Sequence, residues 1–256
     1  QAVYSDRPLN DLTFSLKADN PVVTWLTGNE DCVVIRDFRS STAYKSMWES
    51  EKHMFSELGI EYCAGLRQND DLAGIIAIRK LHMRVMLETG LSSADEMLYP
   101  ENRSYLDDIL SYEAVGARSV ENQQHRLTAS GMDIPVGMKN PTCGDLSVML
   151  NSVTAAQHPH HFIYRGCDVE TSGNDLAHTI LRGGVNQYGQ TIPNYHYEDL
   201  IHLYDLYSQK DLKNPAVIID ANHSNSNKKY KEQIRIVNEV LHSRNCKKEL
   251  HDLVKG

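Results

Sequence analysis

The sequence alternates short apolar runs with amphipathic stretches along most of its 256 residues. Apolar runs typical of buried strands occur at residues 94–98, 114–117, 134–138, 161–164, 179–181 and 216–219. Strands that are separated by helices form parallel βαβ units, in which helices bury both faces of the sheet. The alternation therefore predicts an α/β fold, and folds of this class place their active residues just after the strands.

Five stretches carry apolar residues at helical spacing and are expected to be helices: residues 71–88, 103–112, 146–157, 197–208 and 228–241. Gly90 follows the first where a helix C-cap belongs, and Asp145 precedes the third as an N-cap. The side chains expected to point inward include Ile76, Met83 and Leu87 in the first helix, Tyr105, Leu106, Ile109 and Leu110 in the second, Met149, Leu150 and Val153 in the third, Leu200 and Tyr204 in the fourth, and Tyr230, Ile234, Val237 and Leu241 in the fifth.

A barrel is favoured because nucleotide-binding signatures are missing. The sequence has no GxGxxG and no Walker motif, so dinucleotide-binding and P-loop sheets lack their fingerprints. We therefore expect a (β/α)8 TIM-type barrel over residues 32–256, in which Cys32–Ile35 is a strand that ends at Arg36. Residues 1–31, which Pro8 and Pro21 interrupt, are interpreted as an N-terminal extension or a degenerate first unit.

Charge and composition argue against several classes of partner. The chain has 34 acidic and 26 basic residues, and its formal net charge of −8 opposes binding to nucleic acid or to an anionic membrane. No apolar run approaches the roughly 20 residues of a membrane-spanning helix, and the polar first residues lack a signal-peptide core. Five widely spaced cysteines without a CxxC indicate mostly reduced thiols. We expect a soluble, cytoplasmic protein in which a local cluster of cations binds any anion.

Several of the expected strands end in a charged residue. Arg118 follows the run 114–117, Lys139 follows 134–138, and Arg182 follows 179–181 beside two glycines. If the sheet closes, parallel strands bring such residues to one mouth, where guanidinium groups can bind an oxyanion with two hydrogen bonds each. The residues expected at this mouth are Arg36, Glu96, Arg118, Lys139, Arg182 and His223.

The predominance of cations in this set suits a substrate that carries both a phosphate and a carboxylate. His223 could bind a metal ion or act as an acid or base. There are plainer alternatives. Arg118 and Lys139 could end solvated strands of an acidic protein, and His223 could be a solvent-facing loop histidine. The residues by themselves leave these alternatives open.

Five blocks of the sequence resemble the type I 3-deoxy-D-arabino-heptulosonate 7-phosphate (DAHP) synthases and occur in that family's order. The resemblance covers about residues 71–256 and implies a (β/α)8 barrel that condenses phosphoenolpyruvate with erythrose 4-phosphate. This transferase reaction is the first step of the shikimate pathway to chorismate and the aromatic amino acids, and it requires a divalent metal such as Mn²⁺. We also expect a homo-oligomer. The blocks are Gly116–Arg118 with Glu121–Arg126, Pro135–Asn140, Thr171–Asn174, Ile180–Gly184, and Ile219-Asp220 with His223–Ser226.

The motifs assign phosphoenolpyruvate to one group of residues. By resemblance, Arg118, Lys139 and Arg182 hold its phosphate and carboxylate, and Glu96 lies near the same site. The implied chemistry begins when the metal polarises the aldehyde and C3 of phosphoenolpyruvate attacks it. Water then adds at C2 and phosphate leaves.

Other residues are matched to the aldose and the metal. Arg36 corresponds to the arginine that closes the family's second strand. Arg39 and Thr42 belong to a shortened form of the family's Lys-Pro-Arg-Thr-Thr loop, which contacts the aldose phosphate. His223 corresponds to the metal-binding histidine. Lys139, His223 and Glu96 are thus the expected catalytic residues.

The remaining metal ligands of the family have no match in this sequence. The tetrapeptide Gly-Pro-Cys-Ser, which ends the family's first strand, does not occur, and Cys32 begins its expected strand instead of ending it. The family's Glu and Asp ligands belong to the eighth strand and the segment after it, and the sequence stops at Leu253–Gly256, where that strand would begin. The expected barrel is therefore incomplete, with an unclear first strand and no eighth strand.

Three explanations of the incomplete barrel are open. The chain could be a shortened form of a longer enzyme. The N-terminal residues or a partner chain could fill the gap. Alternatively, the chain could be a catalytically inactive, anion-binding homologue with a regulatory or assembly role.

Overall fold

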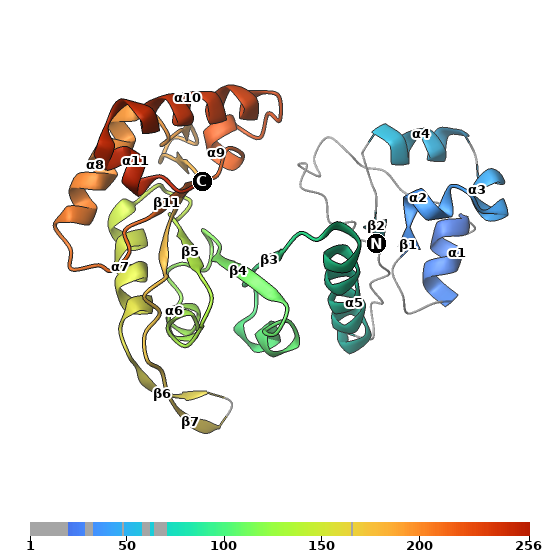
Figure 1. The fold of residues 1–256 in the computed structure, drawn as a ribbon, viewed down its shortest axis with the longest axis horizontal. Helices are drawn as coiled ribbons and strands as arrows, with labels where there is room; N and C mark the ends of the chain where they lie inside the picture. Colours follow the sequence, from blue (N-terminus) through green and yellow to red (C-terminus); the bar gives the residue numbers. More distant parts are fainter. Residues whose placement is uncertain (1–19, 29–32, 48, 58–61, 64–70, 165) are drawn as a thin grey trace. The chain divides into compact units, whose positions relative to one another are not determined.

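The computed structural model describes residues 20–28, 33–47, 49–57, 62–63, 71–164 and 166–256 (Figure 1). The chain divides into two units. The first comprises the residues up to 93 together with 102–109, and the second comprises 94–101 and 110–256. The expected division at residue 31 lies inside the first unit and stays a prediction.

Four short helices precede α5 (Asp71–Thr89) in the described part of the first unit. They are α1 (Pro21–Gly28), α2 (Ile35–Phe38), α3 (Thr42–Lys45) and α4 (Glu49–Glu57). A small hydrophobic core holds them together, and its buried members are Val22, Ile35, Phe38, Met47 and Phe55.

The strand expected to end at Arg36 is confirmed at Val33–Val34, but its expected end and its place in the main parallel sheet are wrong. β1 (Val33–Val34) pairs antiparallel with β2 (Tyr62–Cys63) in a separate two-stranded sheet, and Arg36 lies in α2. The physical reason is that strand pairing covers only two residues. Ile35 and Phe38, which are three positions apart, lie on the same face of α2 and are both buried in the small core.

α5 (Asp71–Thr89) matches the first expected helix. It ends where expected, because Gly90 has a φ of 71° and its amide donates to the Met86 carbonyl over 2.9 Å. Its expected inward face is wrong. Ile76, Met83 and Leu87 are exposed, since the described residues of this unit do not cover them.

The expected helix at residues 103–112 is also wrong. The chain forms a short 3-10 helix, η2 (Pro100–Tyr105), and enters β4 (Leu110–Val115). Apolar residues over so short a stretch fit a helix and a buried strand equally well. Pairing of β4 with the next strand decides between them, because Glu113 to Val115 align with Val136 to Met138.

The second unit is built on a five-stranded sheet with the order β11-β8-β5-β4-β3. Its other strands are β3 (Ser93–Glu96), β5 (Val136–Lys139), β8 (His178–Leu181) and β11 (Val217–Ile219). β4, β5, β8 and β11 run parallel, with Lys139 opposite Ile180 and Leu181 opposite Ile219. The mixed α/β fold with a parallel sheet is thus confirmed, and the parallel strands end along one edge.

Helices cover one face of this sheet (Figure 1). They are α6 (Gln123–Ser130), α7 (Leu146–Gln157), α8 (Tyr197–Ser208), α10 (Glu232–Cys246) and α11 (Lys248–Leu253). Asn122 caps α6 and Asp145 caps α7, each by accepting two backbone amides. α7 contacts β5 and β8, and its Met149 and Leu150 are buried in the main hydrophobic core.

The last expected helix has the wrong bounds and the wrong buried face. A short helix, α9 (His223–Ser226), comes first, and Asn227 and Lys228 then adopt positive φ angles of 51° and 58°, which an α-helix excludes. α10 therefore begins at Glu232. Packing in the main core selects Ile236 and Val240 as the buried residues. The residues expected inward, Tyr230, Ile234, Val237 and Leu241, are exposed.

Two hairpins lie outside the main sheet. β6 (His161–Tyr164) pairs antiparallel with β7 (Cys167–Glu170), so the run 161–164 is a strand but not a member of the parallel sheet. Figure 1 shows this hairpin beyond the lower end of α7. β9 (Gly184–Val185) and β10 (Thr191–Ile192) form the second hairpin, which directly follows Arg182 and Gly183.

The last residues of the chain begin a further pairing beside β11. Val254 forms a parallel bridge with Val217, and the Ile219 amide donates to the Gly256 carbonyl over 2.8 Å. The described strands form an open sheet, and its closure into a barrel stays a prediction. No helix in the described part of the chain is long and apolar enough to cross a membrane. Cys143, Cys167 and Cys246 are free thiols.

Candidate active site

The two faces of the main sheet carry different side chains, apolar on one face and polar at the strand ends of the other. Val115, Met138 and Leu181 lie in the core under the helices, so their neighbours in sequence face the other side of the sheet. That second face carries polar groups at the carboxyl ends of four strands. They are Glu96, Lys139, Arg182 and Asp220.

Lys139 lies at the centre of this polar face. Its Nζ is 2.8 Å from Glu96 Oε2 and 3.9 Å from Asp220 Oδ2. The lysine and aspartate side chains are only 14% and 16% exposed, so water screens their charges weakly. Lys139 therefore links residues at the ends of β3 and β11, which lie on opposite sides of it in the strand order.

Gly116 makes room for Glu96. A Cβ atom at residue 116 would collide with the Glu96 carboxylate. The glycine directly follows β4, and Glu96 is the last residue of β3, the strand beside β4 in the sheet. The sequence Val115-Gly116 thus permits the ion pair between Glu96 and Lys139.

Asp220 and His223 form a second pair. His223 Nδ1 is 2.7 Å from Asp220 Oδ2, and the Asn222 amide donates to Asp220 Oδ1 over 2.9 Å. Burial by itself raises the pKa of Asp220. The hydrogen bond and charge of His223, the Asn222 amide and the charge of Lys139 outweigh burial, and the pKa lies below its ordinary value. Asp220 is therefore an anion at neutral pH.

The backbone at His223 is strained, because its φ of 44° lies in the left-handed region. This conformation turns the ring back toward Asp220. It leaves Nε2, on the other side of the ring, without a hydrogen bond to any described residue.

Arg182 is a buried cation at the end of β8. Only 9% of the residue is exposed, and burial lowers the pKa of its guanidinium, although the charges of Asp220 and Glu96 act in the opposite direction. Its guanidinium makes no ion pair with any residue that the structure describes. A desolvated guanidinium with unused donors is well suited to bind an anion.

Tyr112 and His178 lie deeper on the same face. Tyr112 Oη is 2.9 Å from His178 Nε2, and His178 Nδ1 is 2.8 Å from the Leu176 carbonyl. Nδ1 therefore carries the ring proton, and Nε2 accepts the tyrosine hydrogen. Burial lowers the pKa of His178 and raises that of Tyr112, so both groups are neutral at pH 7. Gly137 leaves space for the tyrosine, because a Cβ there would meet Tyr112 Oη.

The structure brings together some of the residues expected at the mouth. Glu96 and Lys139 form an ion pair, and His223 joins them through Asp220. Arg182 shares their electrostatic environment. Arg118 is exposed, two residues beyond Gly116, in the turn that precedes α6.

Arg36 and the two residues matched to the aldose, Arg39 and Thr42, lie in the first unit. Arg36 is in α2, Arg39 is exposed in the turn after it, and Thr42 begins α3 behind the N-cap Ser41. The structure describes each unit separately, so the roles of these three residues stay predictions.

Sequence reasoning missed Asp220 as a site residue. The signal was available, because Asp220 follows an apolar strand directly, as Lys139 and Arg182 do. The contacts of Asp220 with both Lys139 and His223 depend on tertiary structure and carry no local signal.

The described residues fit one ligand of a metal site. A metal-bound histidine usually donates its second ring N–H to a carboxylate, and the His223–Asp220 pair has this arrangement with Nε2 left over. No group of three or more His, Cys, Asp or Glu side chains that could hold a metal gathers within the described ranges. His223 therefore fits as a single ligand and not as a complete site.

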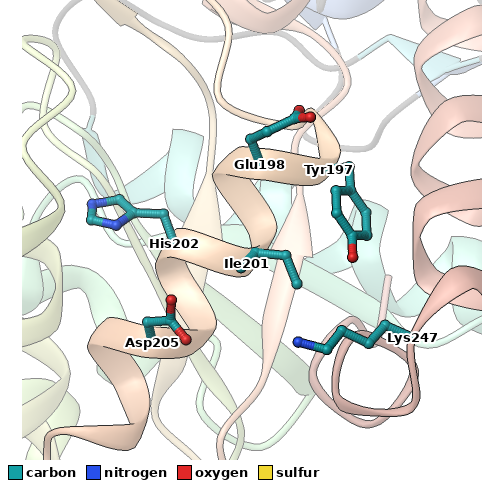
Figure 2. Close-up of a pocket in the computed structure, with 6 residues that line it drawn as sticks. All are labelled: Tyr197, Glu198, Ile201, His202, Asp205 and Lys247. Carbon is teal, nitrogen blue, oxygen red and sulfur yellow. The ribbon is translucent and has the colours of Figure 1, made fainter.

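A pocket lies elsewhere, between α8 and Lys247 (Figure 2). Figure 2 shows Lys247 reaching from the start of α11 toward this helix. None of the strand-end residues contributes to the pocket. Its lining residues are Tyr197, Glu198, Ile201, His202, Asp205 and Lys247.

Known proteins are similar to this chain in sequence and in fold. A sequence model of the DAHP synthetase I family matches residues 64–243. The tyrosine-sensitive phospho-2-dehydro-3-deoxyheptonate aldolase of Escherichia coli K12 is 38% identical over 176 residues, which are 66% of this chain and 47% of that protein. The phospho-2-dehydro-3-deoxyheptonate aldolase of Corynebacterium glutamicum is 38% identical over 150 residues, 57% of this chain and 38% of the relative.

A solved structure agrees with these relatives. The phospho-2-dehydro-3-deoxyheptonate aldolase of Francisella tularensis SCHU S4 superposes with a TM-score of 0.61 at 32% identity. The match covers 69% of this chain and 52% of the other. The chain thus spans about half the length of the first relatives it matches.

Proposed function

Because the chain belongs to the DAHP synthetase I family, we propose that it condenses phosphoenolpyruvate with erythrose 4-phosphate to give DAHP and phosphate. This aldol-type reaction is the first step toward chorismate and the aromatic amino acids. The activity is inferred from relatives that are about twice as long as the matched region, so it needs a direct test.

The observation that carries the proposal is that Arg182, a buried cation without an ion pair among the described residues, lies on the same polar face as Lys139. Phosphoenolpyruvate has a phosphate and a carboxylate close together, and each needs a cation. We assign these anions to Arg182 and Lys139, with Arg118 as a third cation at the rim. Binding between fixed, weakly hydrated cations orients C3 and neutralises the charge that develops during the reaction.

The carboxylates around Lys139 have a different role. Glu96 and Asp220 contact the ammonium and hold it in place before the substrate arrives. The incoming anion then competes with them for the Lys139 donors. We assign the Asp220–His223 pair to the same site, where the ionised Asp220 carboxylate can take up a proton when water adds at C2.

A divalent metal such as Mn²⁺ would supply Lewis-acid polarisation of the aldehyde. His223 Nε2 is the ligand that the described residues offer it. Arg39 and Thr42 are proposed to bind the phosphate of erythrose 4-phosphate, and Arg36 is proposed as a further substrate-binding residue. These assignments follow the family resemblance.

The remaining expectations are part of the same proposal. The second face of the parallel sheet carries buried and half-buried residues, and parallel sheets are normally covered on both faces. Closure into a (β/α)8 barrel would cover it. A barrel domain over residues 32–256, an extension at 1–31, a cytoplasmic location and a homo-oligomer remain predictions.

The test is release of inorganic phosphate from phosphoenolpyruvate in the presence of erythrose 4-phosphate and Mn²⁺. We expect release to require both substrates and to be abolished by Lys139→Met, which keeps the side-chain length and removes the charge. Lys213→Met is the matched control, because Lys213 also pairs with a carboxylate, Asp175, at 2.9 Å, but is 67% exposed and remote from the strand ends.

Two results would overturn the proposal. If the protein binds phosphoenolpyruvate but no divalent metal supports turnover, it is an inactive anion-binding homologue. If Lys139→Met and Lys213→Met change activity equally, Lys139 has no special role in the reaction.

A further inference from the structure

The backbone just beyond β8 is held by side chains instead of by strand pairing. β8 ends at Leu181, and Gly183 adopts a φ of 74°, a conformation that glycine reaches at little cost. Two glycines follow Arg182, so this segment has little intrinsic stiffness. Nevertheless, every backbone donor and acceptor of Arg182 and Gly183 is hydrogen-bonded.

Asn140 makes two of these hydrogen bonds. Its Oδ1 accepts from the Arg182 amide over 3.0 Å, and its Nδ2 donates to the Gly183 carbonyl over 2.8 Å. The asparagine is completely buried and directly follows Lys139 in sequence. It therefore fixes the backbone of one predicted substrate-binding residue from the position next to another.

Asn194 adds a second link from the loop between β10 and α8. Its Oδ1 accepts from the Gly183 amide over 2.7 Å, and its Nδ2 donates to Asn140 Oδ1 over 3.0 Å. It lies 11 residues beyond Gly183 in sequence and is only partly buried. Its contacts are made with the Arg182–Gly183 segment and with the other asparagines.

Asn225 connects this segment to the turn that carries Asp220 and His223. Its Nδ2 donates to the carbonyls of Leu181 over 3.2 Å and of Asp220 over 2.9 Å. Its Oδ1 accepts from the Asn194 amide over 2.9 Å. The neighbouring Ser224 amide donates to the Arg182 carbonyl over 3.1 Å. The two strand-end loops are thus locked together.

We propose that Asn140, Asn194 and Asn225, the asparagine frame, are positioning residues that hold Arg182 in register with the Asp220–His223 pair for anion binding. The inference rests on the proposed function, because it assigns the frame to the same site. A buried guanidinium has less conformational freedom than an exposed one, so it cannot correct an error in the position of its backbone. A misplacement of about 1 Å can reduce reaction rates roughly 100-fold. Without the asparagine frame, the Arg182–Gly183–Gly184 segment would adopt several backbone conformations.

Asn174 offers a matched control for a purely structural asparagine. It is 3% exposed, its Nδ2 donates to the carbonyls of Ala129 and Ile134, and its Oδ1 accepts from the Leu176 amide. It therefore resembles the frame residues in burial and hydrogen bonding. It precedes β8, at the end of the strands opposite to Arg182.

The first test needs no ligand. Amide hydrogen exchange in the 256-residue chain should show the Arg182 and Gly183 amides protected. Asn194→Ala should lower the protection of Gly183 at least about 10-fold, and Asn174→Ala should not. Unprotected amides in the wild-type protein, or equal effects of the two variants, would overturn the frame whatever the protein binds.

The second test is a double-mutant cycle on anion affinity, measured by calorimetry with phosphoenolpyruvate and, separately, with inorganic phosphate. Asn194→Ala should weaken binding about 10-fold, and Asn174→Ala should leave it unchanged at a comparable loss of thermal stability. In an Arg182→Ala background, Asn194→Ala should have no further effect, because the asparagine acts through the arginine.

The outcomes separate the two proposals. Binding that Arg182→Ala weakens and Asn194→Ala does not would overturn only the positioning role. Additive effects in the cycle would also overturn it, since the asparagine would then act independently of Arg182. A wild-type protein that binds neither anion would overturn the proposed function and, with it, the positioning role.

Discussion

Gly183 is the residue at which a single methyl group should separate backbone strain from a steric clash. Its φ is 74°, and a Cβ atom would lie 2.7 Å from Ser224 Cβ and 2.8 Å from the Asn225 backbone nitrogen. Gly189 has nearly the same φ, 76°, with nothing within 4 Å of the corresponding Cβ position. Gly189→Ala therefore measures the strain alone, and Gly183→Ala measures strain plus collision.

The expected magnitudes follow from these two terms. An alanine in the left-handed region costs about 1–2 kcal/mol of unfolding free energy. Overpacking against α9, whose backbone must move, adds about 1–3 kcal/mol. We expect Gly189→Ala to destabilise the second unit by about 1 kcal/mol and Gly183→Ala by about 3 kcal/mol. The displaced α9 should also weaken anion binding in Gly183→Ala only.

The assay must report on the second unit by itself. Urea unfolding followed by hydrogen exchange of peptides from β8 and β11 meets this need, and a shift in midpoint at constant slope gives the free-energy difference. If the two variants lose the same stability to within about 0.5 kcal/mol, the close approach of Gly183 to α9 is not energetically important. That result would refute the reasoning, because the strain term is common to both.

Three further predictions concern the polar face. Arg182→Ala should weaken phosphoenolpyruvate binding roughly 10- to 100-fold in calorimetry while the thermal midpoint changes little, because the guanidinium has no ion-pair partner among the described residues; equal losses would make it a structural residue. The pKa of Asp220 is lowered in the folded state, so its stabilising contribution is present above the unfolded pKa of about 3.9 and is lost as pH falls through the folded value. Asp220→Asn should therefore be less stable than the wild type at neutral pH, with a gap that closes in acid denaturation profiles below about pH 4, and a gap independent of pH would contradict this assignment. Gly116→Ala should push Glu96 away from Lys139 and lower kcat/KM for phosphate release about 10-fold, and unchanged kinetics would show that this ion pair is dispensable.

Much of the fold around the polar face was predictable from local pattern. The runs before Arg118, Lys139 and Arg182 are strands of one parallel sheet, because continuous apolar runs between helical stretches have few other solutions. Two helix-capping residues were also predicted correctly from the sequence. Asp145 and Gly90 act at helix ends through hydrogen bonds that depend on only a few neighbouring residues.

The errors occurred where two patterns were compatible with the same residues. α10 carries two apolar stripes, and the sequence spacing favoured Ile234 and Val237 over Ile236 and Val240. Only packing in the main core decides which stripe is buried. Likewise, the run 161–164 has strand character in any setting, and pairing with β7 removes it from the sheet.

The sequence by itself determined that Lys139, Arg182 and His223 follow apolar runs and that Glu96 lies within one, since strand periodicity and strand ends are local properties. Tertiary structure alone decided how these residues meet. Lys139 lies between Glu96 and Asp220. Asn140, Asn194 and Asn225, which lie up to 85 residues apart in sequence, hold the backbone of the segment 181–183. No local pattern encodes such contacts, because each partner comes from a different strand or loop and only the register of the folded sheet sets the distance between them.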